Sequence, residues 1–221
     1  PYESLNPRMT VGEIVSEGLR IQGGCSAQER RERVLQILEQ VGLSKEHYGR
    51  YPHEFSGGQR QRIGIARALI VNPRFIVCDE PVSALDVSVQ AQIINLLAQL
   101  QRELELTVLF ISHDLRVVRH ITHRVMVMYL GSNVEVGPTE AIFQHPAHPY
   151  TQVLTKAAPK LDPLNRQRDY AIEGEPPSPI HTPTGCKFHP RCPYCTDKCR
   201  SEVPELKEIA PGHLCACHYP L

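Results

Sequence analysis

The stretch Ser56-Gly57-Gly58-Gln59 has residue types and spacing that suit the binding of an anion. The glycines open an apolar pattern with helical spacing, so unpaired backbone N–H groups and the positive end of the helix dipole would meet at this turn. The Ser hydroxyl and the Gln amide add hydrogen-bonding groups for a phosphate. A Gly-Gly turn before a helix is more often only a cap, so the rest of the sequence has to decide between the two roles.

Acidic residues and a histidine follow two apolar runs further along the chain. Asp79 and Glu80 come at the end of residues 75–78, and His113 follows residues 108–111. If both runs are parallel strands, these side chains meet at the sheet edge where open α/β sheets bind ligands. Asp79 can then hold Mg²⁺ through water, and Glu80 can orient an attacking water for phosphoryl transfer. Taken singly, the acids fit a solvated strand end equally well, and a lone histidine is usually structural.

Helices that could support these residues carry their own start signals. Capping boxes at Thr10–Glu13 and Ser26–Glu29 predict two helix starts. Apolar residues at helical spacing predict a further helix from Gly58 to Leu69, which Asn72-Pro73 ends. Further helices are expected at residues 87–103, 115–121, 139–144 and 150–156.

Short apolar runs between these helices predict an α/β domain. They cover residues 75–78, 108–111 and 125–128, and continuous runs of this length are typical of parallel strands buried on both faces. The turn at residues 131–133, followed by alternating residues, predicts a closing hairpin. After Pro159 the chain is rich in proline, which predicts an extended linker.

The composition of the chain narrows the classes of partner that it is expected to bind. The chain has 24 basic and 24 acidic residues, so its formal charge of zero gives no field that would favour nucleic acid as the main partner. Its apolar runs fall far short of the roughly 18 to 20 residues that a membrane-spanning helix needs. Any function at a membrane therefore requires other chains to cross it.

Six of the eight cysteines lie between positions 186 and 217, which marks a separate C-terminal module. No export signal precedes them, so metal ligation is favoured over disulfides. Four thiolates can hold Zn²⁺ or an iron–sulfur cluster, and Cys192-x-x-Cys195 has the gap that both favour. A metal-free tail stays open as an alternative. The neighbouring His189, His213 and His218 are expected at the surface.

In this combination and order, the motifs resemble those of the nucleotide-binding subunits of ABC transporters. Residues 55–59 match the signature motif, 75–80 the Walker B strand, 83–86 the D-loop and His113 the switch histidine. The resemblance implies that two subunits sandwich ATP and Mg²⁺, each signature motif capping nucleotide held by the other subunit. It implies catalytic roles for Glu80 and His113, and contacts to nucleotide or Mg²⁺ for Ser56, Gly57, Gly58, Gln59, Asp79 and Asp86.

Further stretches resemble the oligopeptide and dipeptide importers, namely residues 2–9, 51–55, 148–151 and 185–193. By this resemblance a four-Cys set, Cys186, Cys192, Cys199 and Cys217, is similar to the ligands of a [4Fe–4S] cluster, with Zn²⁺ bound through Cys195 as the alternative. The implied partners are a second ATP-binding subunit, identical or not, transmembrane permease subunits and, indirectly, an extracellular substrate-binding protein. The implied place is the cytoplasmic face of the membrane.

The resemblance also implies a fold, a partial P-loop NTPase of the ABC type with a helical subdomain and a Cys-rich extension. Residues 1–72 would form the helical subdomain with the signature motif, 73–140 the C-terminal part of the RecA-like core and 141–221 the extension. No G-x-x-x-x-G-K-S/T sequence is present and the first residue is Pro1, so we expect a C-terminal fragment of such a subunit, inactive alone.

Two other functions fit part of the pattern. A soluble ATPase of the same superfamily, acting in DNA repair or translation, would carry the same ATPase motifs. Alternatively, the Cys-rich tail is a metal or redox sensor and the ATPase body its scaffold. The transported substrate does not follow from this sequence, since relatives of this branch move peptides, nickel, glutathione and sugars.

Overall fold

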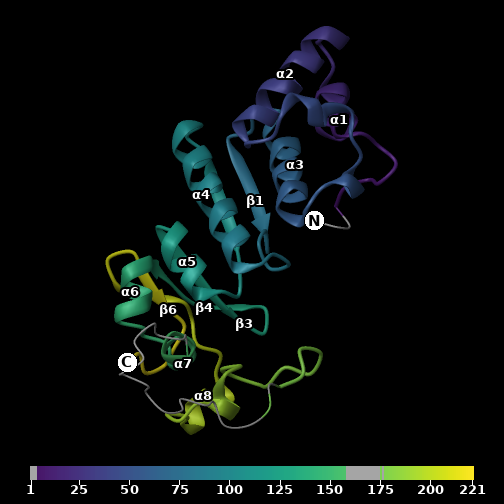
Figure 1. Cartoon of the computed structure of the whole chain (residues 1–221). Helices are drawn as coiled ribbons and strands as arrows, with labels where there is room; N and C mark the ends of the chain where they lie inside the picture. Colours follow the sequence, from purple (N-terminus) through teal and green to yellow (C-terminus); the bar gives the residue numbers. More distant parts are fainter. Residues whose placement is uncertain (1–3, 158–174, 176) are drawn as a thin grey trace. The chain divides into compact units, whose positions relative to one another are not determined.

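The computed structural model describes residues 4–157, 175 and 177–221 (Figure 1). The chain divides into two compact units, Pro1–His113 and Asp114–Leu221. The predicted boundaries after residues 72 and 140 divide the chain by function rather than by compactness. That division stays a prediction. The proline-rich linker predicted after Pro159 lies largely outside the described residues.

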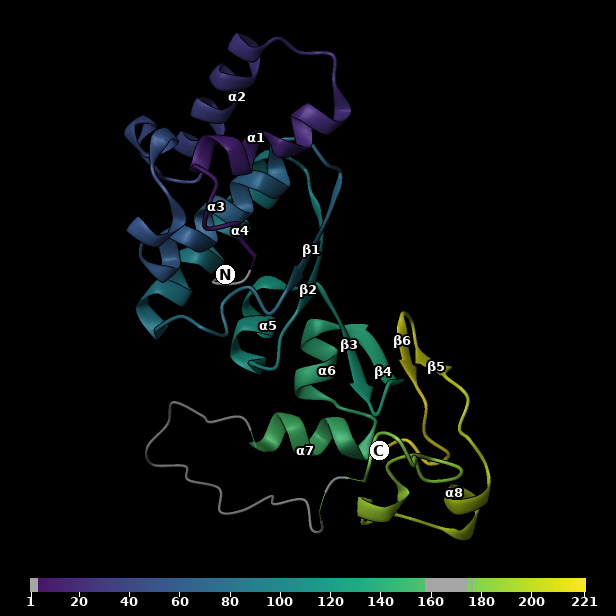
Figure 2. The same ribbon diagram turned by 90° about the vertical axis from the view of Figure 1, so that its right-hand side faces the viewer.

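Helices open the first unit (Figure 2). These are α1 (Val11–Gln22), α2 (Ala27–Gln40) and α3 (Gly57–Leu69), with short 3₁₀ turns at Lys45–Gly49 and Pro52–Glu54. Both predicted capping boxes are confirmed, because the side chains of Thr10 and Ser26 each accept the N–H of a glutamate three residues on, and that glutamate caps in return. The helices bury apolar side chains such as Ile14, Leu38 and Ile63 against one another.

Two parallel strands follow in the same unit. β1 (Phe75–Asp79) pairs with β2 (Thr107–Ile111), in a register that runs from Phe75 opposite Thr107 to Asp79 opposite Ile111. Helix α4 (Val87–Glu103) connects them, and Asp86 caps its start. The predicted parallel pairing is confirmed. Its predicted burial on both faces is wrong, because alternate side chains are exposed, among them Val77 at 56% and Leu109 at 49%.

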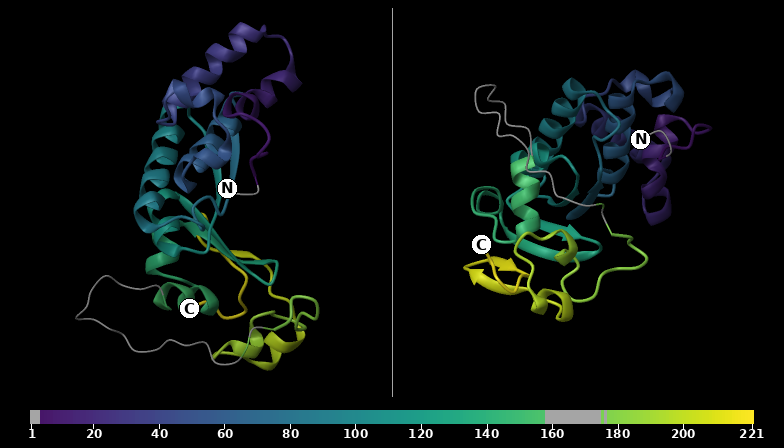
Figure 3. Two further views of the ribbon diagram at one scale, coloured as in Figure 1. Left: turned by 45° about the vertical axis from the view of Figure 1, so that its right-hand side comes forward. Right: turned by 90° about the horizontal axis from the view of Figure 1, so that it is seen from below.

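The second unit contains an antiparallel sheet. Among the described residues its strand order is β3-β4-β6-β5, and the β5–β6 ribbon is drawn in yellow in Figure 3. The strands are β3 (Arg124–Tyr129), β4 (Ser132–Pro138), β5 (Lys207–Ala210) and β6 (His213–Cys215). The helices are α5 (Leu115–Ile121), α6 (Thr139–Gln144), α7 (Pro149–Ala157) and α8 (Asp197–Ser201), with a 3₁₀ turn at His189–Arg191.

The prediction that residues 125–128 form a parallel strand buried on both faces is therefore wrong. Leu130 and Gly131 both have positive φ, 45° and 72°, which is the turn geometry that sends a strand directly back along its neighbour. The predicted hairpin is thus confirmed as β3–β4. Along β3 every second residue is buried, as expected of a sheet with one covered face.

Phe188 packs the Cys-rich segment onto this sheet. Its side chain is 1% exposed, and its ring centroid lies 5.3 Å from that of Tyr129 and 5.4 Å from that of Tyr150. Tyr129 ends β3 and Tyr150 belongs to α7. The aromatic contacts therefore hold the segment that begins at Cys186 against the hairpin and α7.

A fully buried carboxylate joins three segments of the second unit. Glu135, on β4, is 0% exposed. Its Oε1 accepts the N–H of Ala147 and lies 2.7 Å from Nε2 of His213, and its Oε2 accepts the N–H of His148. The prediction that His213 lies at the surface is wrong, since its side chain is buried against this carboxylate on the neighbouring strand β6.

We predict that Glu135→Ala destabilises the second unit by about 3–5 kcal/mol, because it leaves two buried N–H groups and an imidazole without their acceptor. The measurement is urea unfolding of the chain. The control is Glu140→Ala, which removes an exposed ion pair with Arg119 and should change the unfolding midpoint little. Equal effects of the two substitutions would contradict the structural role assigned to Glu135.

Candidate functional site

The glycine-rich turn forms a helix cap. The cap uses side-chain oxygens as acceptors and leaves side-chain hydrogen-bond donors for other partners. The Ser56 hydroxyl accepts the N–H of Gln59 at 3.4 Å, and Oε1 of Gln59 accepts the N–H of Ser56 at 3.0 Å. The cap predicted as the simpler interpretation is therefore present. It uses acceptor atoms only, so the Ser O–H and the Gln NH₂ group keep their donor capacity. A cap built in this way remains compatible with anion binding.

Glycine is required at this turn by a close helix contact. A Cβ built on Gly58 would lie 2.4 Å from Cγ1 of Val89 in α4, and one on Gly57 would lie 3.1 Å from a methyl group of Leu85. The start of α3 thus lies directly against the segment that begins α4. Asp86 belongs to that segment and accepts the N–H of Val89 and the hydroxyl of Ser88.

Hydrogen bonds keep Asp86 ionised. The Ser88 hydroxyl, followed by the backbone N–H of Val89, holds the pKa of Asp86 below its ordinary value. Gln90 fixes the preceding loop by donating from Nε2 to the carbonyl of Val82 at 2.9 Å. The segment predicted to be the D-loop is therefore held at both ends by hydrogen bonds.

The ends of β1 and β2 bring the predicted carboxylate and histidine together. Nδ1 of His113 lies 2.8 Å and 3.0 Å from the two carboxylate oxygens of Glu80. The N–H of Glu80 donates to the carbonyl of Ile111, which extends the parallel ladder by one residue. Glu80 has a φ of 46°, an uncommon conformation for a residue with a side chain. Both side chains are solvent-accessible, 40% for Glu80 and 74% for His113.

A cavity of about 280 Å³ adjoins this strand edge within the first unit. Asp79 and Glu80 line it together with Gln61 and Arg67 of α3. The predicted site residues thus fall into two groups. Asp79, Glu80 and His113 gather at the strand edge, whereas Ser56 to Gln59 lie beside the Asp86 segment.

Four cysteines line a second, small cavity of about 10 Å³ within the second unit. They are Cys186, Cys192, Cys199 and Cys217. Cys195 and Cys215 are not among the residues that line it. The structure thus groups the same four cysteines that the family resemblance implied. Among the described residues, no three His, Cys, Asp or Glu side chains stand in an arrangement that could hold a metal ion as they are.

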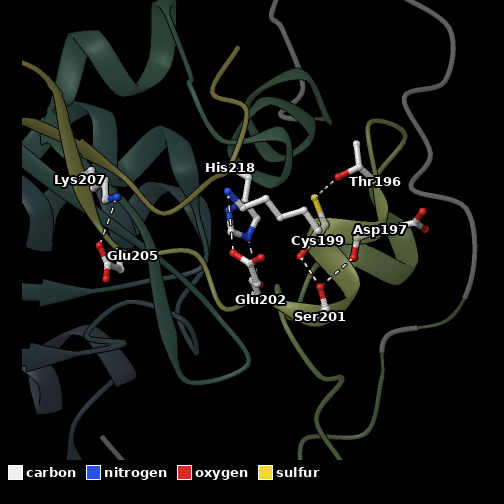
Figure 4. A network of polar contacts seen from close by, with 9 residues as sticks. Thr196, Asp197, Cys199, Ser201, Glu202, Glu205, Lys207 and His218 are labelled. Atoms are coloured by element: carbon white, nitrogen blue, oxygen red, sulfur yellow. Dashed lines mark hydrogen bonds and ion pairs between the residues drawn. The ribbon is translucent and has the colours of Figure 1, made fainter.

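Burial favours the protonated form of three of these thiols. It raises the pKa of Cys192 to about 11 and raises the pKa of Cys186 and Cys217 as well, with smaller contributions from the neighbouring thiols. The backbone N–H of Cys186 donates to the carbonyl of Cys199, which ties the two ligand candidates together. Figure 4 shows Cys199 with the Thr196 hydroxyl 3.5 Å from its sulfur.

Sequence reasoning missed His148, which lines the same cavity. The stretch that contains it, residues 148–151, resembles importers, but no spacing rule connects it to the cysteines. Burial lowers the pKa of His148 to about 4, and the nearby Glu135 raises it by less. His189 and His218 also line the cavity and are partly exposed.

Comparison with known proteins identifies the family. The ABC transporter family model matches residues 2–83, and the model of the oligopeptide/dipeptide transporter C-terminal region matches residues 134–199. A di/tripeptide transport ATP-binding protein of Pseudomonas aeruginosa is 52% identical over 99% of this chain and 68% of its own length. The chain belongs to the ATP-binding proteins of peptide ABC transporters.

Other relatives agree with this family. A dipeptide transport ATP-binding protein of Haemophilus influenzae is 56% identical over 99% of this chain and 67% of its own length. A probable peptide ABC transporter ATP-binding protein of Sinorhizobium fredii is 54% identical over 99% of this chain and 62% of its own length. The chain thus spans about two thirds of the length of these curated relatives.

Solved structures support the ABC ATPase fold. An ATP-binding cassette dimer in a post-hydrolysis state, bound to ADP and phosphate, is 35% identical with a TM-score of 0.55, over 62% of this chain and 59% of that one. CbiO1 of Clostridium perfringens, part of an ABC transporter complex, is 29% identical with a TM-score of 0.59, over 66% of this chain and 57% of that one. In the described part of this ABC protein, no helix has both the length and the apolar character needed to cross a membrane.

We predict that Gly58→Ala destabilises the chain by about 1–3 kcal/mol, because Val89 is branched and stiff and α3 must move away from α4. The control lies in the same helix. A Cβ on Gly64 would meet nothing within 4 Å, so Gly64→Ala should stabilise the chain by up to about 1 kcal/mol through helix propensity. Thermal unfolding of both variants checks this, and a destabilised Gly64→Ala with an unaffected Gly58→Ala would contradict the packing.

Proposed function

We propose that this chain energises peptide import across the cytoplasmic membrane by hydrolysing Mg²⁺-ATP as the nucleotide-binding subunit of an ABC transporter. The observation that carries the proposal is the contact of Glu80 with His113 beside Asp79, at the end of two parallel strands. The relatives are named as peptide transport ATP-binding proteins. The partners would be a second ATP-binding subunit, identical or not, and transmembrane permease subunits at the cytoplasmic face. An extracellular binding protein would deliver the peptide to the permease.

The strand edge would supply the hydrolytic groups. Asp79 ends β1 and lines the cavity, so its carboxylate can hold Mg²⁺ through water. The carboxylate of Glu80 can orient and polarise the water that attacks the γ-phosphate. His113 holds that carboxylate in place through Nδ1, and as an imidazolium it would also add positive charge beside the γ-phosphate. Mg²⁺, when bound, neutralises the charge that develops on the phosphates.

The glycine-rich turn would serve ATP held by the other subunit. Its cap leaves the Ser56 hydroxyl and the Gln59 amide as donors at the positive end of α3. Gly57 and Gly58 lie against Leu85 and Val89, so nucleotide contacts at the turn would be transmitted to the Asp86 segment by direct packing. This coupling would let each subunit sense the nucleotide of its partner.

We predict that Glu80→Gln in the assembled transporter lowers ATP turnover about 100-fold or more while ATP binding is retained, because the amide cannot accept a proton from the attacking water. Turnover is measured by phosphate release and binding by nucleotide filtration. The control is Glu103→Gln, an exposed glutamate at the end of α4 that accepts from Gln99. Unchanged turnover in Glu80→Gln would assign the catalytic role to another residue.

We predict that residues 1–221 by themselves show no measurable ATP binding or hydrolysis. The sequence has no G-x-x-x-x-G-K-S/T motif, whose lysine and nest of N–H groups supply most of the triphosphate contacts. Titration calorimetry with Mg²⁺-ATP is the measurement. Micromolar affinity would show that the residues described above bind nucleotide without a P-loop.

A metal centre held by four thiolates is the second part of the proposal. The four cysteines that line one cavity provide a donor set that suits a [4Fe–4S] cluster or Zn²⁺. The resemblance to importers favours the cluster, which would require the partly buried ligand side chains to move outward. The present cavity is only about 10 Å³, so either group would require the cysteine side chains to move from their present positions.

We predict that anaerobic purification yields a chain with four irons and four sulfides, or else with one zinc, and that Cys192→Ser loses this metal. Cys195→Ser is the matched control, because Cys195 donates its thiol to the carbonyl of Thr196 and does not line the cavity. Elemental and sulfide analysis separates the two metals. A wild-type chain without either, or equal loss in both variants, would contradict the proposed ligand set.

A further inference from the structure

Two of the four cysteines that line the small cavity are also joined through the backbone. The N–H of Cys186 donates to the carbonyl of Cys199 at 2.8 Å. Standard bond lengths then keep the two Cα atoms within about 6.7 Å of each other, even if the path between them were straight. Cysteines that form disulfides in proteins have Cα atoms about 4.4–6.8 Å apart. The pair therefore meets the distance condition for a disulfide bond.

The two side chains also converge on one place. Cys186 and Cys199 both line the cavity of about 10 Å³, so their Cβ atoms do not point apart, which is the second condition for a disulfide. The sulfur of Cys199 lies 3.5 Å from the Thr196 hydroxyl, a long contact that an S–S bond can replace (Figure 4). Among the described residues, no other two cysteines both line this cavity and share a backbone hydrogen bond.

A close backbone approach holds the two segments in this register. A Cβ built on Gly185 would lie 2.5 Å from the carbonyl oxygen of Cys199, and Gly185 has a φ of 63°. Only glycine accepts both the contact and the conformation. The hydroxyl of Thr184 donates to the carbonyl of Arg200 at 3.1 Å. Residues 184–186 thus run against residues 199–200 along two hydrogen bonds, and the cysteines stay paired.

We propose that Cys186 and Cys199 form a reversible disulfide by exchange with a small-molecule disulfide. Both are free thiols in this structure, and Cys186 is the more exposed of the two. Its sulfur loses a proton to solvent, attacks the reagent and releases one reagent thiolate, which takes up a proton. Cys199 then displaces the second reagent thiol in the same way. Two cysteine thiols are oxidised to one S–S bond, and the reagent disulfide is reduced to two thiols.

The bond would close a loop around the residue that anchors the Cys-rich segment. Phe188 lies between the two cysteines in the sequence and packs on Tyr129 and Tyr150. A cross-link at the ends of this loop restricts the unfolded chain, which stabilises the docked form. The attachment of the segment to the sheet then depends on the oxidation state of the surrounding thiols. The bond uses two of the four candidate metal ligands, so it belongs to the metal-free chain.

The experiment treats the whole chain, freed of metal with a chelator and then of reductant, with oxidised glutathione. Free thiols are blocked with iodoacetamide, and the bond is located by mass spectrometry of peptides. We expect a single disulfide that links Cys186 to Cys199 and opens with dithiothreitol. In urea, the same treatment should instead favour near neighbours such as Cys192 with Cys195, because short loops close more readily. The oxidised chain should also unfold at a higher urea concentration than the reduced chain.

Matched serine variants separate this pair from the other cysteines. Cys199→Ser should abolish the bond, whereas Cys195→Ser should retain it, because Cys195 does not line the cavity. The wild-type peptide map decides the question even if a variant fails to fold. A folded chain that forms no disulfide, or that links other cysteines, would overturn the proposal. The same link formed equally well in urea would also overturn it, because the pairing would then owe nothing to the fold.

Discussion

The parallel pairing of β1 with β2 is the constraint on which the candidate ATP site depends. Backbone hydrogen bonds set Asp79 opposite Ile111 and continue to the N–H of Glu80, so residues from two distant parts of the sequence end at the same edge. The contact between Glu80 and His113 follows from that register. A shift by one residue would turn one of these strands over and separate the carboxylate from the imidazole.

The second constraint is the close approach of α3 to the beginning of α4. Only glycine fits at Gly58 without moving Val89, so the turn at the start of α3 packs directly against the segment of Asp86. In the second unit, Glu135 has a comparable role, because it fixes the backbone of His148 and the side chain of His213 at once.

Features with local causes were predictable from the sequence. The caps at Thr10 and Ser26 require a partner three residues away, and the β3–β4 hairpin requires its turn at Gly131. Features with distant causes were not. The burial of His213 depends on a carboxylate 78 positions earlier in the chain, and the extension of the β3–β4 hairpin into a four-stranded sheet depends on the pairing of β4 with the distant β6. The place of His148 beside the cysteines was not predictable for the same reason, because the other walls of the cavity come from later segments of the chain.

We infer that the Ser56 turn contacts ATP whose P-loop belongs to another subunit. Photoaffinity labelling of the assembled transporter, with a reactive group on the γ-phosphate of ATP, followed by peptide mapping, tests it most directly. Label is expected within residues 56–60, and it should be lost when the two ATP-binding subunits are prevented from pairing. Label that avoids this turn while the nucleotide is bound, or that persists without pairing, would contradict it.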